Sequence, residues 1–190
     1  MSRISDQTVD GYLDAVSARR STPGGGAVAA IVAAEACALL EMVLNFTQSE
    51  DARLTGMAAR LGQTRPELLA MADRDMAAFE QVMQAYRGDG DLAAALVLAA
   101  ETPLAIIAIC RTLSADAVLL GEIGNRNLIT DVAIAASLLI TALESSEINV
   151  LVNTRAMHKE RAATEVRLGD SRELKQTLSA LVADIRNGLT

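Results

Sequence analysis

The segment that decides the fold covers residues 21–47 and reads STPGGGAVAAIVAAEACALLEMVLNFT. Pro23 and the three glycines after it cannot continue a helix, because proline lacks an amide donor and glycine leaves the backbone too free. From Ala27 to Thr47 the chain is apolar on nearly all sides of a helical period, which is typical of a helix buried on most faces. The segment predicts a loop followed by the central helix of an all-α domain.

The composition of the 190-residue chain favours the same class. Hydrophobic residues make up 51%, aromatic residues 2%, and alanine alone supplies 35 residues. A core of alanine and aliphatic side chains indicates closely packed helices, because alanine has the best helix propensity and lets backbones approach. The scarcity of aromatic residues argues against a β-sandwich core and against a surface that stacks nucleic acid bases.

Five further helices follow from the apolar periodicity and the helix-breaking residues. They cover about residues 8–18, 51–86, 91–122, 130–158 and 170–187. Thr8 is the expected N-cap of the first of these, and Pro66 and Pro103 are expected to bend the helices that contain them. The sequence contains no repeat or linker, and it predicts one domain, residues 1–190, built as a bundle of about six helices.

The charge balance limits the partners. Lys and Arg number 17 against 24 Asp and Glu, which gives a net charge of −7. An acidic surface disfavours binding to nucleic acid and to anionic membranes. The N-terminus is polar, and Glu35 and Glu41 interrupt the most apolar window, so we expect neither a signal peptide nor a membrane span. We expect a cytoplasmic protein.

The central helix and the helix at 130–158 are more apolar than a monomer of this size can shield, because small domains leave much of their surface in water. We therefore expect self-association. A closed twofold dimer is the default symmetry, and its seam is a place where an active site can form.

The sequence predicts no metal site. Cys37 and Cys110 lie far apart in apolar helical patterns without a second ligand at metal spacing, so we interpret both as small core residues. His158 is the single histidine and lies beside charged residues, where we expect it to be solvated and not catalytic.

The loop Thr22-Pro23-Gly24-Gly25-Gly26 is the most specific local motif. Glycines let a ligand approach the backbone amides, and the helix N-terminus that follows carries partial positive charge, so an anion or a carbonyl oxygen can bind there. The loop is neither a P-loop nor a dinucleotide fingerprint, because no Lys-Ser/Thr follows it and no strand precedes it. A flexible turn that allows tight helix packing is the alternative.

Four polar residues stand in apolar stretches. Asp75 lies in a methionine-rich segment, and Asp131 precedes a long apolar run. Desolvation raises the pKa of a carboxyl and suits it to acid–base catalysis near neutrality, whereas a solvated Asp75 and a helix-capping Asp131 are the alternatives. Asn149 and Asn153 share one helix face, where buried amides either tie helices together or hold a ligand.

These fragments occur in an order that resembles a known family. Residues 21–30 resemble the signature of the formiminotetrahydrofolate cyclodeaminase / methenyltetrahydrofolate cyclohydrolase family. Later fragments that look like its other landmarks are residues 75–79, Pro103-Leu104, Gly124-Asn125, residues 130–132 and residues 149–153. The similarity spans nearly the whole chain, and the ordered set is more specific than any one fragment.

The resemblance implies an all-α homodimer that acts on a folate without a metal or a further cofactor. The implied reaction is hydrolysis of 5,10-methenyltetrahydrofolate to 10-formyltetrahydrofolate, or release of ammonia from 5-formiminotetrahydrofolate. By their positions in the motifs, Asp75 and Asp131 are the implied catalytic carboxylates. The implied substrate-binding residues are Thr22, Pro23, Gly24, Gly25, Gly26, Asn125, Asn149 and Asn153.

The chain departs from the family pattern at two places. The family carries a basic segment where this chain has residues 48–51, QSED, and a Pro-Lys loop where it has residues 88–91, GDGD. Both differences remove cations, which the carboxylates of a folate glutamate tail require as partners. Two alternatives follow: a folate enzyme that holds the tail by other residues such as Arg126 and Arg155, or a non-catalytic relative that binds another small ligand or a protein.

Overall fold

A computed structural model describes residues 3–157 and 159–189. The α-helices of this part of the chain are α1 (Val9–Ser17), α2 (Gly25–Asn45), α3 (Met57–Tyr86), α4 (Leu92–Ile123), α5 (Ile129–Arg155), α6 (Arg161–Val166) and α7 (Ser171–Asn187). Short 3-10 helices cover Ile4–Asp6, Ala52–Leu54 and Arg126–Leu128. No strand occurs among the described residues, and the all-α prediction is confirmed.

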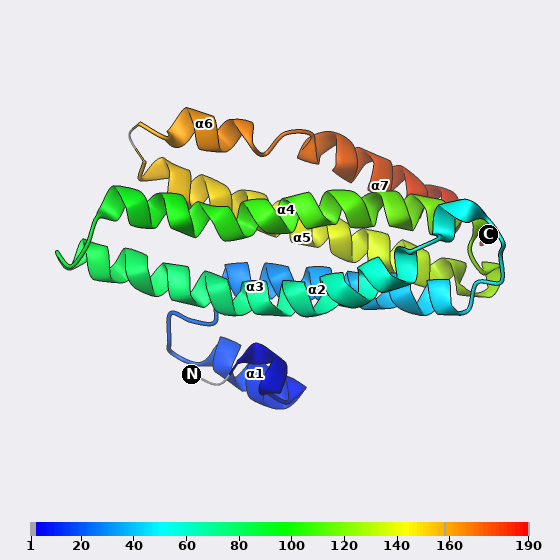
Figure 1. Cartoon of the computed structure of the whole chain (residues 1–190), viewed down its shortest axis with the longest axis horizontal. Coiled ribbons are helices and arrows are strands. Elements are labelled where there is room, and N and C mark those ends of the chain that lie inside the picture. The colour runs from blue at the N-terminus through cyan, green and yellow to red at the C-terminus, as the bar shows by residue number, and fades with distance from the viewer. Residues whose placement is uncertain (1–2, 158, 190) are drawn as a thin grey trace.

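Helices α2 to α5 form an antiparallel bundle whose connections alternate between its two ends (Figure 1). α2 packs against α3, α4 and α5, and α4 packs against α3 and α5. The start of α2, the end of α3, the start of α4 and the end of α5 therefore meet at one end of the bundle. The turn between α4 and α5 lies at the opposite end (Figure 1).

The core is built on α2, as the sequence predicts. Ala27, Ala33, Leu40 and Val43 of this helix are fully buried. Both cysteines are buried in the core, and burial raises the pKa of each thiol to about 12. Their interpretation as small core residues is confirmed, because both side chains are fully buried within the apolar core.

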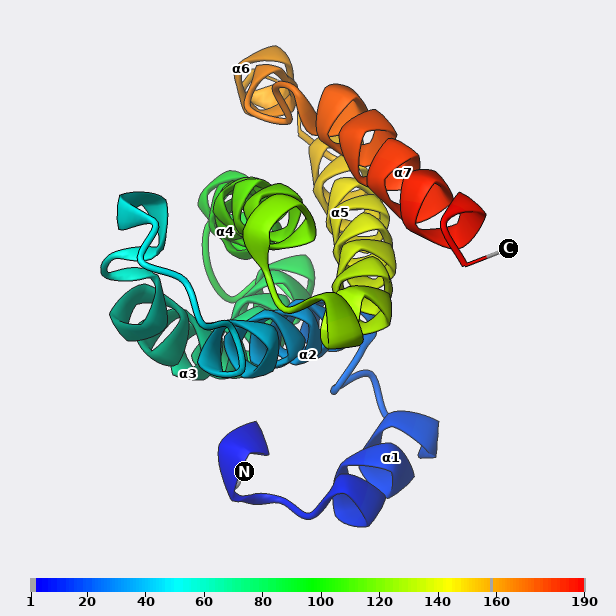
Figure 2. The same cartoon turned by 90° about the vertical axis from the view of Figure 1, so that its right-hand side faces the viewer.

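The N-terminal helix α1 stands apart from the bundle (Figures 1 and 2). Its N-cap is Thr8, whose side chain accepts a hydrogen bond from the Gly11 N–H at 3.1 Å, as predicted. None of its residues is buried; Val9 is 77% exposed and Leu13 is 56% exposed. The apolar face of α1 thus finds little cover within one chain.

Several helix boundaries differ from the prediction. The sequence predicts a helix from residue 51, whereas a 3-10 turn comes first and α3 begins after Gly56, which has a φ of +77° that glycine adopts without penalty. α5 ends at Arg155, and His158 lies outside the described residues. The short α6 follows; its six residues are too few to show a helical period. α3 and α4 each continue through their proline.

Three stretches are long and apolar enough to cross a membrane by length and composition: α2, α4 and residues 126–155. Glu35 and Glu41 therefore do not by themselves exclude a span, contrary to the sequence argument. In the fold these helices pack against one another. Half of the most apolar window of α2 is buried inside the chain, against a third of that in residues 126–155, so a larger share of the second window is left uncovered.

Candidate functional site

A cavity of about 310 Å³ opens at the bundle end where α2 begins. Its walls come from the glycine loop, the second half of α3, the start of α4 and the end of α5. The predicted residues that line it are Thr22, Gly24, Gly25, Gly26, Asp75, Asn149 and Asn153. It is smaller than other hollows on the surface, but it is the place where residues predicted from separate parts of the sequence converge.

Asp75 is the acidic group of the cavity, and it faces the start of α2. The N-cap of this helix is Gly24, which has no side chain to accept a hydrogen bond, and the Asp75 carboxylate accepts one from the Ala27 N–H instead. Burial raises the pKa of Asp75, and this hydrogen bond partly offsets the rise. A carboxyl with a raised pKa is suited to accept and return a proton near neutrality.

The glycines of the loop have different neighbours. A Cβ at Gly26 would collide with the Asp75 carboxylate, whereas a Cβ at Gly25 would meet the Asn149 side-chain amide at an ordinary 3.9 Å. Gly26 is therefore the position where the close approach of α3 to α2 requires glycine. The packing interpretation of the loop holds for Gly26, while Gly24 and Gly25 line the cavity.

The two asparagines of α5 do different work. The Asn153 Nδ2 donates to the Ala99 carbonyl of α4 at 3.2 Å. This carbonyl would bond the N–H of residue 103 in a regular helix, but Pro103 has none, so Asn153 satisfies the acceptor that proline leaves free. The Asn149 Nδ2 donates to the Ser145 carbonyl of its own helix at 2.8 Å. Asn153 is thus a tie between helices at the edge of the cavity.

The rim of the cavity is apolar, and no cation lines it. Phe79, Tyr86 and Val152 are 37%, 57% and 66% exposed there. Lys and Arg are absent from the described lining, and no group of three or more His, Cys, Asp or Glu within residues 3–157 and 159–189 is placed to hold a metal ion. An apolar rim around a few polar groups is typical of a site for a small organic ligand.

Three predicted site residues lie outside this cavity. Asp131 is in the first turn of α5, roughly 27 Å along the helix axis from Asn149, where its charge suits the positive end of the helix. Asn125 caps the turn between α4 and α5, and its Nδ2 donates to the Phe46 carbonyl at 2.8 Å. Pro23, which follows a cis peptide bond, lines a neighbouring hollow instead. The expectation that Asp131 and Asn125 share a site with Asp75 is wrong within one chain.

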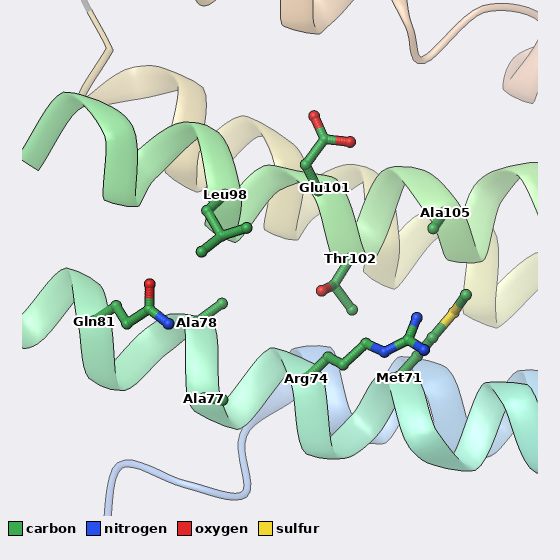
Figure 3. A pocket seen from close by; sticks show the side chains of 9 residues that line it. All are labelled: Met71, Arg74, Ala77, Ala78, Gln81, Leu98, Glu101, Thr102 and Ala105. Carbon is green, nitrogen blue, oxygen red and sulfur yellow. The ribbon is translucent and has the colours of Figure 1, made fainter.

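A second hollow, of about 380 Å³, lies between α3 and α4 (Figure 3). Arg74 and Thr102 lie on its two sides, while Glu101 points away from α3 (Figure 3) and forms an ion pair with Arg167 at 2.5 Å. None of the predicted site residues lines this groove. The glycine-loop cavity is therefore the candidate active site.

The comparisons with known proteins agree with this fold. The family model described as formiminotransferase-cyclodeaminase matches residues 8–169. A methenyltetrahydrofolate cyclohydrolase of Methylorubrum extorquens is 33% identical over 193 residues, which cover 93% of this chain and 92% of the relative. The formimidoyltransferase-cyclodeaminase of Mus musculus is 26% identical over 94% of this chain, but the match covers 37% of the mouse protein.

The same agreement holds for structure. The crystal structure of formiminotetrahydrofolate cyclodeaminase from Thermotoga maritima superimposes with a TM-score of 0.90 and 32% sequence identity, covering 98% of both chains. The fold is an all-helical bundle with a cavity suited to a small organic ligand. The chain belongs to the formiminotransferase-cyclodeaminase family.

Proposed function

We propose that the chain is a folate-dependent one-carbon enzyme that hydrolyses 5,10-methenyltetrahydrofolate to 10-formyltetrahydrofolate. The cyclohydrolase relative that matches nearly full length supports this reaction. The single observation in the fold that supports it is the half-buried Asp75 beside the start of α2. The proposed reaction uses side chains and water, with no cofactor besides the folate substrate, and we place it in the cytoplasm.

The chemistry gives the carboxylate a defined task. The methenyl bridge of the substrate is an electrophilic amidinium carbon with a positive charge, and a facing carboxylate favours its binding. Asp75 takes a proton from water as the oxygen attacks the bridge carbon. The tetrahedral intermediate then breaks its bond to N5, which receives the proton that Asp75 holds. As this bond breaks, the hydroxyl oxygen becomes the formyl carbonyl and gives its remaining proton to Asp75, which releases it to solvent. The free oxygen of Asn149 and the amides of the glycine loop are suited to hold the polar edge of the pterin.

The test is a spectrophotometric assay of the purified protein with methenyltetrahydrofolate, whose absorbance is lost when the ring opens. Asp75→Asn is the informative variant, because an amide keeps the shape and accepts from the Ala27 N–H but takes no proton. We expect it to lower kcat by about a hundredfold or more while the melting temperature changes little. Wild-type protein that neither turns over nor binds the substrate would support the non-catalytic alternative.

A second candidate reaction is the release of ammonia from 5-formiminotetrahydrofolate, which the Thermotoga maritima structure favours. Here N10 attacks the formimino carbon and ammonia leaves, so the reaction builds the ring that the hydrolase opens. The same carboxylate is suited to deliver the proton that the leaving ammonia needs. Formation of methenyltetrahydrofolate from the formimino substrate, with ammonia in equal amount, distinguishes this reaction from hydrolysis.

We further propose that the protein is a homodimer whose seam runs along α5. One face of this helix carries residues spaced by alternating steps of three and four. They are Asp131, Ile134, Leu138, Thr141, Ser145, Ile148, Val152 and Arg155. Ile134, Ile148 and Val152 are 51%, 62% and 66% exposed, so the stripe is not covered within one chain.

The stripe is complementary to a second copy of itself that runs in the opposite direction. Against an antiparallel second copy, Ile134 faces the partner's Val152 and Leu138 faces the partner's Ile148. Thr141 then faces the partner's Ser145, and Asp131 faces the partner's Arg155, so both apolar and charged ends match. Such a self-complementary patch is what a twofold interface requires. It assigns Asp131 to an ion pair across the seam, beside the partner's cavity, because Val152 lines that cavity.

A further inference from the structure

We propose that Arg20 and Arg87 form the subsite that holds the carboxylates of the folate glutamate tail. This inference rests on the proposed function, because it names how the same site holds the rest of its substrate. It also answers how a chain without the family's two basic segments binds an anionic tail.

The two arginines line a groove of about 400 Å³ that adjoins the candidate active site. The groove and the cavity share four lining residues, so a ligand can extend from one into the other without leaving the protein surface. These residues are Ser21, Thr22, Phe79 and Met83. The cavity itself offers Asp75 and amides but no cation, whereas the groove offers two guanidinium groups. The charge pattern along this path suits a ligand that is cationic at one end and anionic at the other.

Methenyltetrahydrofolate has this distribution of charge. Its bridge carbon is positive, and its glutamate tail ends in carboxylates. With the bridge at Asp75, the tail has to leave the cavity by an open side, and the exposed Phe79 on the shared wall offers its ring to the aminobenzoyl group between the two ends. Guanidinium groups bind carboxylates in bidentate geometry, which makes arginine the suitable residue for this end.

Both arginines are free to bind a ligand. Seven other arginines of the described chain, and Lys175, are in ion pairs with Asp or Glu. Within that same part of the chain, neither the Arg20 nor the Arg87 side chain has an ion pair or a hydrogen bond. Glu80 is the acidic residue of the groove, and Gln84 adds an amide donor. The net charge of the groove is therefore positive.

The other cations considered for this task are placed differently. The Arg126 side chain donates to the Gly121 and Glu122 carbonyls at 3.4 Å, at the bundle end opposite the cavity. Arg155 is exposed and lines neither the cavity nor the groove. Arg74 is an unpaired arginine of α3, the helix that Arg87 follows, but it lines the separate groove between α3 and α4 (Figure 3). Arg74 therefore serves as the matched control.

The experiment compares two substrates in three proteins. The substrates are methenyltetrahydrofolate with a triglutamate tail and methenyltetrahydropteroate, which has no glutamate. In the double variant Arg20→Ala/Arg87→Ala, we expect KM for the triglutamate substrate to rise about tenfold or more, while kcat and the KM for the tail-free substrate stay unchanged. Arg74→Ala should leave both KM values unchanged. An equal rise of KM for both substrates, or none for either, would overturn the inference.

A binding measurement separates this inference from the proposed function. Calorimetry with p-aminobenzoyl-triglutamate needs no turnover. We expect the wild type to bind this tail fragment, and the double variant to bind it about tenfold or more weakly. The affinity of the wild type should fall as the salt concentration rises. If the wild type turns over neither substrate but binds the fragment through the two arginines, the reaction is wrong and the subsite stands. The subsite would be overturned if the double variant bound the fragment as tightly as the wild type. It would also be overturned if inorganic phosphate displaced the fragment equally well from both proteins.

Discussion

The Asp75 carboxylate occupies the space that a side chain at Gly26 would fill, and it accepts a hydrogen bond from the next residue, Ala27. Helix α3 thus supplies the cap that the glycine start of α2 lacks. The two features depend on each other. Gly26 leaves room for the Asp75 carboxylate, and Asp75 accepts a hydrogen bond from the Ala27 N–H, which would otherwise have no acceptor.

Gly26→Ala tests this close approach. The added methyl group pushes Asp75 away from α2, and we expect the free energy of unfolding to fall by about 1–3 kcal/mol, although alanine favours a helix interior. Denaturant unfolding of the two proteins measures the difference. Gly25→Ala is the matched control for folding, because its methyl group meets only an ordinary contact. Equal stability of the Gly26 variant and the wild type would show that the two helices are farther apart in solution.

The pH dependence of the reaction should report Asp75. Because burial raises the pKa of Asp75, we expect the acid limb of the kcat/KM profile to lie above about pH 4, where an ordinary aspartate titrates. The residual activity of Asp75→Asn should lack this limb. The free energy of unfolding should depend on pH in the opposite sense to the activity. The folded state holds the proton more tightly than the unfolded state, so the contribution of Asp75 to stability is greatest below about pH 4 and is lost as pH rises through the raised pKa. The measurement is the stability difference between wild type and Asp75→Asn across that window.

The charged ends of the α5 stripe allow a swap experiment. Asp131→Arg sets two arginines against each other at both ends of the proposed seam and should weaken the dimer about tenfold or more. Asp131→Arg/Arg155→Asp restores the pair in reverse and should recover most of the affinity. Analytical ultracentrifugation measures both. A wild type that stays monomeric at micromolar concentration, or a double variant no tighter than the single one, would contradict the antiparallel seam.

Asn153 and Pro103 form a testable pair through the Ala99 carbonyl. Asn153→Ala removes the donor from a buried acceptor, and we expect a loss of about 1–3 kcal/mol of stability. In a Pro103→Ala background the alanine N–H can bond Ala99 within α4, so the same Asn153 substitution should cost less. A double-mutant cycle by denaturant unfolding gives the coupling, and additive losses would mean that the two residues act separately.

The fold was largely predictable because α2, α4 and α5 carry apolar residues on nearly every side, a signal that survives without knowledge of their neighbours. Short elements were not: α6 has six residues, and the delayed start of α3 depends on the left-handed Gly56. A local backbone conformation of this kind leaves no periodic trace in the sequence.

The candidate site was predictable in part. Asp75 and the glycine loop were identified because polar or flexible residues in apolar stretches are informative. Asn125 and Asp131 were assigned to the same site by resemblance, although an antiparallel bundle puts the turn between α4 and α5 at the far end. Arg20 and Arg87 were missed, because arginines in loops and at helix ends are common and only the folded chain shows that they share a groove.

Because Asp75 caps α2, its protonation during the reaction should change the hydrogen exchange of a backbone amide in that helix. Whenever Asp75 holds a proton, Ala27 faces a neutral acceptor in place of a charged one, and this one hydrogen bond weakens although the buried carboxyl is relieved of its larger desolvation cost. Amide hydrogen exchange at Ala27 should therefore quicken during turnover and slow again when substrate is exhausted. Exchange at the first turn of α2 thus reports the protonation state of Asp75. A substitution that makes this turn more rigid would also change how readily the carboxyl gives up its proton.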